Sequence, residues 1–263
     1  MSLLGFKSTH GIEKTELFRA AGKVTQSRGL IFEAHLPNAA VGSLARILPA
    51  GAGLRDFERA AMAEVIGFRN KRAMLMAFDD LAGLNSGSLV VLEEEAPTVG
   101  VGSQLLGRAL DGRGSPIDGG PPLSVGLERR GIYQRPSDPL KRTMIHEPLD
   151  LGIRAINAML TCGKGQRVGI MAGSGVGKSI LLGMMARNTS ADVNVIALIG
   201  ERGREVREFI ERDLGTEGLK RSIVIVATSD QSPLLRMRAA FLACTVAEYF
   251  RDRGKDVLFM MDS

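Results

Sequence analysis

The feature that most constrains the fold is a glycine-rich loop, AGSGVGKS, at positions 172–179. It follows the short apolar run 167–171 and precedes the helical stretch 178–190. Glycines let the backbone turn so tightly that successive N–H groups point inward, and the helix that follows presents more free N–H groups to the same point. This strand–loop–helix order predicts an α/β domain that binds a phosphate group.

Apolar runs alternate with amphipathic helices from position 165 onward, which is typical of a parallel sheet covered on both faces. Ser232 followed by Pro233 predicts a capped helix start, and Gly254 predicts its end near Arg253. The expected strands are 167–171, 193–199, 222–228 and 256–262, and the other expected helices are 178–190 and 204–214.

The first part of the chain follows a different pattern, with short apolar runs every 8–15 positions between glycine and asparagine turns. Runs at this spacing without long helices between them favour a small antiparallel sandwich or barrel. A short helix around Leu17 and Phe18 is expected before them. The expected strands are 23–27, 30–36, 43–48, 63–68, 71–78 and 88–93.

A domain boundary is expected at the acidic triplet Glu93–Glu95 and Pro97. It divides the chain into an N-terminal domain with a short tail, 1–97, and a nucleotide-binding core, 98–263. Within the core, the segment 105–123 is rich in Gly, Pro and Asp and is expected to form turns and extended chain. The basic, proline-broken segment 128–142 reads as a surface linker.

Composition excludes several classes of protein. The net charge of +5 comes wholly from positions 98–263, which carry 23 basic and 18 acidic groups, while positions 1–97 carry 11 of each. This excess fits phosphates of a small ligand and is not by itself a nucleic-acid footprint. Cys162 and Cys244 are expected to be reduced thiols, and the three histidines lack metal-ligand spacing. With no signal peptide and no apolar run near 20 residues, the sequence predicts a cytoplasmic location.

The loop residues have distinct predicted roles. Lys178 supplies a positive charge for the β and γ phosphates of a nucleotide, and the Ser179 hydroxyl is a ligand for Mg²⁺. The predicted cofactors are therefore ATP and Mg²⁺. The predicted nucleotide contacts are Gly173, Ser174, Gly175, Val176, Gly177, Lys178 and Ser179.

Two further segments carry candidate catalytic or metal-binding residues. Glu201 and Arg202 follow the second expected strand, where a carboxylate at the carboxyl end of a parallel sheet can activate water. The residues alone leave open that ERGRE is only the solvated start of a helix. Asp262 ends the run VLFMMD, the Walker B pattern whose carboxylate holds Mg²⁺, although many buried strands end in Asp.

Taken together, these motifs resemble the flagellum-specific (type III export) ATPase family, which is related to the catalytic subunits of F1-type rotary ATP synthases. The resemblance spans roughly Gly22 to Ser263. Its motifs are GSGVGKSILLGMMAR (173–187), LIGERGREVREFI (198–210), SPLLRMRAAF (232–241), RDRGKDVLFMMDS (251–263), LGRALDGRGSPIDGG (106–120) and LDLGIRAINAMLTCGKGQRVGI (149–170).

The resemblance implies an N-terminal β-barrel, a RecA-like P-loop domain and a homo-hexameric ring in the full-length protein. It implies Mg-dependent ATP hydrolysis that energises protein export, with Lys178 at the phosphates, Glu201 as the catalytic carboxylate, and Ser179 and Asp262 at the metal. Arg202 is a further catalytic candidate from the residues themselves, able to hold the Glu201 carboxylate or sense the γ-phosphate. The implied partners are a flagellar ATPase regulator, a stalk protein, export chaperone–substrate complexes and the membrane export gate. The implied location is the cytoplasm, with peripheral association at the membrane export apparatus and no nucleic acid.

Four alternatives share these residues. An injectisome secretion ATPase and an F1-type rotary subunit would use the same chemistry with other partners. An RNA translocase of the Rho type would need basic and aromatic residues on the N-terminal domain, but positions 1–97 are net neutral and contain no Trp or Tyr. The fourth alternative is a fragment that binds nucleotide without catalysis.

The sequence departs from the family at its end, one residue after Asp262. In the family, further core strands follow, together with an arginine finger and a helical C-terminal domain, and one strand usually inserts between those that carry the Walker A and Walker B motifs. We therefore expect an incomplete nucleotide-binding domain with an open sheet edge, from a truncated product or partial sequence. Low stability and doubtful hydrolysis by this chain alone are expected.

Overall fold

The computed structural model describes residues 20–49, 51–52, 60–78, 83–94, 97–123, 126–173 and 175–262, and for Glu94 the backbone alone. The chain divides into two compact units, Met1–Ala96 and Pro97–Ser263. The short helix expected around Leu17 and Phe18 lies outside the described residues.

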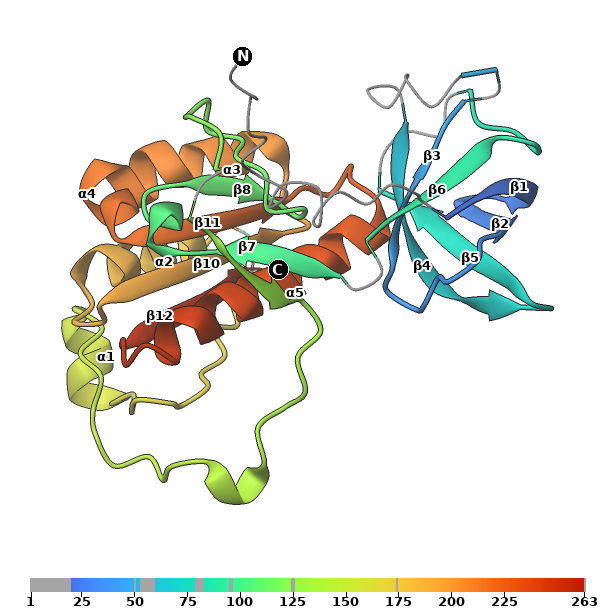
Figure 1. Ribbon diagram of the computed structural model, residues 1–263. Helices are drawn as coiled ribbons and strands as arrows, with labels where there is room; N and C mark the ends of the chain where they lie inside the picture. The colour runs from blue at the N-terminus through green and yellow to red at the C-terminus, as the bar shows by residue number, and fades with distance from the viewer. Residues whose placement is uncertain are drawn as a thin grey trace, which may run out of the picture. The chain divides into compact units, whose positions relative to one another are not determined.

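The first unit is a closed barrel of six antiparallel strands in the order β1-β2-β5-β4-β3-β6 (Figure 1). Each of the six predicted strands is confirmed, and of the two predicted architectures the barrel is the one that forms. The strands are β1 (Ala21–Arg28), β2 (Ile31–His35), β3 (Leu44–Ile47), β4 (Ala61–Arg69), β5 (Arg72–Ala77) and β6 (Leu89–Glu94).

Alternating side chains fill the barrel. Phe32 and Ala34 on β2 and Ala73 and Leu75 on β5 are buried, while the residues between them are half-buried or exposed. A period of two with one apolar face is what a closed antiparallel sheet requires. Asn70 and Lys71 join β4 to β5 with φ angles of 49° and 63°, the left-handed pair that a two-residue hairpin needs.

The second unit contains a parallel sheet in the order β12-β10-β11-β8. Helices lie on its two faces, α5 on one and α2 on the other (Figure 1). Its two central strands alternate apolar residues between two cores: Val195 and Ile225 pack with α5, and Ile196 and Val224 pack with α2. Both faces are therefore covered, as expected for an α/β domain. The strands of this unit are β7 (Thr98–Val101), β8 (Ala109–Asp111), β9 (Glu128–Gly131), β10 (Val193–Ile199), β11 (Ser222–Ala227) and β12 (Val257–Asp262).

The three predicted helices form, and four further short helical elements occur among the described residues of this unit. Ser232 caps α5 as predicted, because its hydroxyl accepts a hydrogen bond from the Leu235 N–H at 3.3 Å. Among the described residues, no helix is long and apolar enough to cross a membrane. The helical elements are η2 (Ser103–Leu105), η3 (Pro139–Lys141), α1 (Arg154–Met159), α2 (Lys178–Asn188), α3 (Gly203–Glu208), the π-helical η4 (Phe209–Leu214), α4 (Gly215–Lys220) and α5 (Pro233–Arg251).

The predicted strand 167–171 is wrong. The segment carries no regular structure, and Met171 is 95% exposed. A cavity of about 690 Å³ has residues 168–171 and 258–262 on its walls, so the segment faces β12 without pairing to it. An extended segment becomes a strand only when its backbone groups find a partner. Among the described strands, β12 pairs with β10 alone, so the expected open edge is present.

Two other expectations need correction. The segment 105–123, expected to be turns and extended chain, contains β8, which pairs with β11 at the other edge of the sheet. The segment 128–142, expected to be a linker, begins with β9, which pairs with β7. Both strands are short and are held by partners distant in sequence, so local composition could not reveal them.

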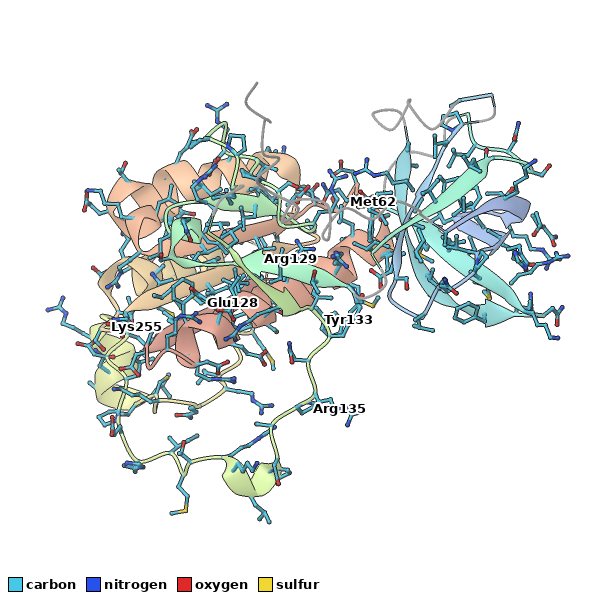
Figure 2. All side chains as sticks on the ribbon, in the orientation of Figure 1. Met62, Glu128, Arg129, Tyr133, Arg135 and Lys255 are labelled. Carbon is cyan, nitrogen blue, oxygen red and sulfur yellow. The ribbon has the colours of Figure 1, made fainter. Side chains whose placement is uncertain are left out.

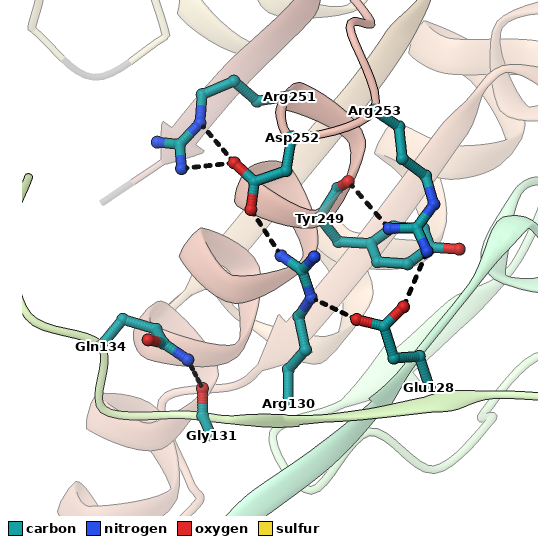
Figure 3. A network of polar contacts seen from close by, with 8 residues as sticks. All are labelled: Glu128, Arg130, Gly131, Gln134, Tyr249, Arg251, Asp252 and Arg253. Carbon is teal, nitrogen blue, oxygen red and sulfur yellow. Dashed lines mark hydrogen bonds and ion pairs between the residues drawn. The ribbon is translucent and has the colours of Figure 1, made fainter. Parts of the chain in front are cut away.

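Polar contacts fix β9 to the end of α5 (Figure 3). Arg130 donates to Glu128 at 2.9 Å and to Asp252 at 2.8 Å, and Arg253 donates to Glu128 at 2.7 Å. The Arg253 guanidinium also lies 3.7 Å from the centre of the Tyr249 ring. The hydrogen bonds from Arg130 and then Arg253 lower the pKa of Glu128. This segment is therefore anchored rather than a free linker.

Beyond β9 the chain becomes exposed. Figure 2 shows Glu128, Arg129, Tyr133 and Arg135 following one another along β9 and the segment after it. Of these four residues, Tyr133 packs against α5. Its ring meets that of Phe241 edge to face, with 5.0 Å between the ring centroids. From 134 to 148 every residue is exposed, which agrees with the expected surface character of this part.

The core beneath α5 gives a stability prediction. Leu242 is fully buried against the sheet, so Leu242→Ala should lower the free energy of unfolding by about 2–5 kcal/mol. Met237→Ala, on the same helix but at a position 49% exposed, should cost less than about 1 kcal/mol. Urea unfolding followed by tyrosine fluorescence measures both, because Tyr133 and Tyr249 both lie in this unit. Equal losses in the two variants would contradict the packing described.

Candidate nucleotide-binding site

The glycine-rich loop leads directly into α2. Gly175 and Gly177 have φ angles of 78° and 100°, a region that side chains disfavour, and Gly177 is the residue that precedes the first helical turn. No side chain of the described residues caps this helix start. The free N–H groups and the positive dipole end of α2 therefore face the loop, which is the standard arrangement for binding a phosphate.

Lys178, the first residue of α2, reaches across to the end of β12. Its Nζ lies 2.5 Å from Oδ1 of Asp262, whose side chain is buried. The hydrogen bond to Asp262 is the main cause of the raised pKa of Lys178, and the charge of Glu201 adds to it. The predicted phosphate lysine and the predicted Walker B carboxylate are therefore in contact.

Glu201 lies one residue beyond Gly200, just after β10, and is half-buried. Burial raises the pKa of this carboxyl, a hydrogen bond with Glu205 raises it further, and the charge of Asp262 adds to the rise. Lys178 acts in the opposite direction. These mutual effects place Glu201, Lys178 and Asp262 in one electrostatic cluster at the carboxyl edge of the sheet.

The other predicted residues are placed less centrally. Arg202 is exposed and donates from Nη1 to Oε1 of Glu205 at 3.4 Å. Gly173, Val176 and Ser179 are exposed around the start of α2, and Ser174 lies outside the described residues.

The sequence reasoning did not select Glu205. Its signal was an acidic residue in the first turn of the expected helix 204–214, close in sequence to Glu201. In the structure, Glu205 touches both residues of the predicted pair, through its hydrogen bond with Glu201 and its ion pair with Arg202. Glu205 therefore belongs to the site as a neighbour of the proposed base.

The Mg²⁺ expectation can be tested against the available donors. Among the described residues, no three His, Cys, Asp or Glu side chains group as a self-sufficient metal site. Mg²⁺ is commonly held by one or two protein oxygens, with water and phosphate oxygens completing its shell. The exposed Ser179 hydroxyl and the Asp262 carboxylate fit that kind of site.

The far end of α2 is held by a donor from β10 and by one from the residue before β11. Arg221 donates to three backbone carbonyls there: Ala186 at 3.0 Å, Thr189 at 2.6 Å and Ala191 at 3.4 Å. The buried Asn194 also donates to the Ala186 carbonyl, at 2.8 Å. A cation at the carboxyl end of a helix satisfies its free carbonyls and complements its dipole.

The middle of α2 is fixed by a close approach. A Cβ added to Gly183 would lie 2.5 Å from the carbonyl oxygen of Asp213. Only glycine allows the helix to pack this closely on η4. With Arg221 at its end, this contact fixes the helix that carries Lys178 and Ser179.

Fold and site together define a nucleotide-binding domain of the phosphate-loop class. Comparison with known proteins narrows this further. Residues 152–263 match the family model "ATP synthase alpha/beta family, nucleotide-binding domain". The chain is 50% identical over 252 residues to the flagellum-specific ATP synthase of Bacillus subtilis, covering 96% of this chain and 56% of that protein. It is 45% identical over 245 residues to the type 3 secretion system ATPase of Xanthomonas euvesicatoria, covering 93% and 54%.

Comparison with solved structures gives the same result as comparison of sequences. The assembled ATPase EscN from the type III secretion system of enteropathogenic E. coli matches with a TM-score of 0.80 at 45% identity, over 92% of this chain and 56% of EscN. EscN in complex with its central stalk EscO matches with a TM-score of 0.82 at the same identity, over 92% and 57%. The predicted resemblance to the flagellum-specific ATPases is therefore confirmed. The chain spans about half the length of these relatives.

The anchoring of α2 gives a prediction for the site. Arg221→Met should lower the free energy of unfolding by about 1–3 kcal/mol, since it leaves helix carbonyls without their donor. It should also weaken binding of a fluorescent ATP analogue, because Lys178 and Ser179 depend on the position of α2. Arg221→Lys should restore part of both losses. Lys220→Met, which removes the neighbouring exposed cation, is the control and should change neither. Unchanged affinity in a destabilised Arg221→Met protein would limit Arg221 to a structural role.

Proposed function

We propose that this chain carries the barrel and nucleotide-binding part of an Mg-dependent ATPase that energises flagellar type III protein export. The observation that carries the proposal is the cluster of Lys178, Asp262 and Glu201 beside a free helix start. The similarity to flagellum-specific ATP synthases supports the biological role.

The site residues have separate roles in the proposed reaction. The loop N–H groups and the Lys178 ammonium bind the phosphates of ATP, and Lys178 leaves Asp262 to do so. Ser179 and Asp262 would hold Mg²⁺, which would neutralise phosphate charge. Because Asp262 is buried, its carboxylate keeps a fixed position for this exchange.

Glu201 is the proposed general base. Its Oε atoms accept the proton of the attacking water, and the raised pKa of this carboxyl makes it a stronger base than an ordinary glutamate. The negative charge of Glu205 contributes to that raised pKa. Arg202, the third predicted catalytic residue, acts through its ion pair with Glu205.

The proposed assembly follows the relatives. EscN has been solved as an assembled ATPase and in complex with its central stalk. We infer a homo-hexamer for the full-length protein, with a stalk protein, an ATPase regulator, export chaperone–substrate complexes and the membrane export gate as partners. The proposed location is the cytoplasm, peripherally at the export apparatus.

An injectisome ATPase is the second candidate. The type 3 secretion system ATPase of Xanthomonas euvesicatoria is 45% identical to this chain, within the range of its flagellar relatives. The catalytic assignment is the same for both, so the tests below apply to either role. Rescue of motility in a strain that lacks its flagellar ATPase would favour the flagellar role.

The central prediction concerns Lys178 and Glu201. Lys178→Ala should abolish binding of a fluorescent ATP analogue, because it removes the phosphate cation. Glu201→Gln should keep binding but lower Mg-dependent ATP turnover by about 10²–10⁴-fold, because it removes the base. Both variants should be measured beside the chain itself. Lys220→Ala and Glu217→Gln are matched controls, since both residues are exposed and pair with each other.

Three outcomes distinguish the alternatives. Turnover that both site variants reduce would support catalysis by this chain. Binding lost in Lys178→Ala without turnover in any sample would indicate a non-catalytic nucleotide-binding part. Binding that survives Lys178→Ala would contradict the site itself.

The pH profile offers a separate prediction. The base must be deprotonated, so a raised pKa of Glu201 moves the acid limb of the rate to a higher pH than an ordinary glutamate would give. Glu205→Gln removes a negative neighbour and should move this limb to lower pH. Carboxyl ¹³C NMR titration, with Glu201 assigned from the Glu201→Gln spectrum, measures the same shift without turnover. An unchanged or higher Glu201 pKa in Glu205→Gln would contradict the coupling.

A further inference from the structure

Four basic residues lie in one row across neighbouring strands of the barrel. Lys23 of β1 is the register partner of His35 of β2, and Arg69 of β4 is the partner of Arg72 of β5. The β2–β5 register, with Ala34 opposite Ala73, places His35 beside Arg72. The strand order β1-β2-β5-β4 thus produces an uninterrupted row (Figure 1). We call Lys23, His35, Arg72 and Arg69 the basic row.

The basic row lies on the outer face of the barrel. All four residues are exposed, while their chain neighbours Val24, Ala34 and Ala73 are buried. Strands lie about 4.8 Å apart, so three steps give the row a length of about 14 Å. Lys71, also exposed, extends it at the β4–β5 turn.

This arrangement carries a cost in stability. Like charges directly opposite each other on paired strands repel, as Arg69 and Arg72 do. The nearest acidic group with an ion pair to the row is Glu33, 3.9 Å from Arg72. Within the described part of the chain, no ion pair involves Lys23, Arg69 or Lys71. Elsewhere on the barrel, by contrast, Arg46 is paired with Glu93.

We propose that the basic row is a docking surface for an acidic α-helix of a protein partner, lying across the four strands. A helix advances 5.4 Å per turn, so carboxylates on one face recur at nearly the spacing of the strands. Such a helix meets each basic group with one carboxylate and relieves the repulsion between Arg69 and Arg72. The surface acts independently of the nucleotide site.

The chemistry of the surface favours a protein helix over a nucleic acid. Single-stranded nucleic acid needs aromatic side chains on which bases stack. The first 97 residues contain no Trp and no Tyr. Phe68, which precedes Arg69 on β4, is 49% exposed, but its register partner is the buried Ala73, so strand alternation places it on the opposite face from the row.

The test uses two fluorescein-labelled, Ala-rich helical peptides of about 20 residues and identical composition. One carries its glutamates along a single face at i, i+4 and i+7, and the other distributes them around the helix. Fluorescence anisotropy with the 263-residue chain should show tighter binding of the aligned peptide, weakened by salt. The triple variant Lys23→Gln, Arg69→Gln and Lys71→Gln should weaken this binding about tenfold or more.

The control variant removes the same number of positive charges outside the row. It is Arg28→Gln, Lys141→Gln and Arg142→Gln, all at exposed positions. It should bind the aligned peptide normally. Arg69→Gln alone should keep or raise the thermal midpoint, because it removes a like-charge pair, so lost binding cannot be attributed to unfolding. If the triple variant fails to fold, Lys23→Gln and Lys71→Gln are measured singly.

Several results would overturn the proposal. They are equal binding of both peptides, no binding of the aligned peptide, or equal loss in the row and control variants. Row-dependent binding of vesicles with anionic lipid, of single-stranded RNA, or of a second copy of the chain in sedimentation, without binding of the aligned peptide, would assign the surface to that occupant instead.

Discussion

The ion pair between Lys178 and Asp262 is the contact on which the candidate site depends. It joins the start of α2 to the end of β12, two elements that are far apart in the sequence. A buried carboxylate requires a partner, and a lysine at a helix start repels the helix dipole. The pair answers both requirements. In the proposed function, phosphate binding is an exchange of partners by a lysine that is already held at the helix start.

That exchange requires α2 to stay in place while its first turn changes partners. The structure meets this need away from the loop, through the Arg221 and Asn194 donors at the end of α2 and the close packing at Gly183. The rigid contacts thus lie at the middle and end of the helix, whereas the loop and Ser179 remain exposed. Pre-organisation of this kind lowers the entropy cost of binding a ligand at the helix start.

Elements with strong local periodicity were predictable from sequence, and those that depend on distant partners were not. The run 193–199 became β10 with the expected bounds, and Ser232 capped α5 as expected. The run 167–171 has equally strand-like composition but no strand beside it, while β8 lies in a turn-rich segment and forms because β11 pairs with it. In the site, the edge rule for parallel sheets placed Glu201 and Asp262 at the ends of the paired strands β10 and β12. It did not account for Lys178, which reaches that edge from α2 although the strand expected before its loop is absent. It could not foresee that Arg202 would face Glu205, because that depends on rotamers at a helix start.

The basic row likewise could not be predicted from the sequence, because it depends on which strands are paired. Positions 1–97 carry equal numbers of basic and acidic residues, so a count by sequence finds a neutral domain. Only the register of four strands reveals that Lys23, His35, Arg72 and Arg69 are neighbours. Repulsion across β4 and β5 is a cost that folding alone does not require, because either arginine could be replaced by a neutral residue without loss of the core. A cost of this kind is best explained by a charge that arrives from outside the barrel.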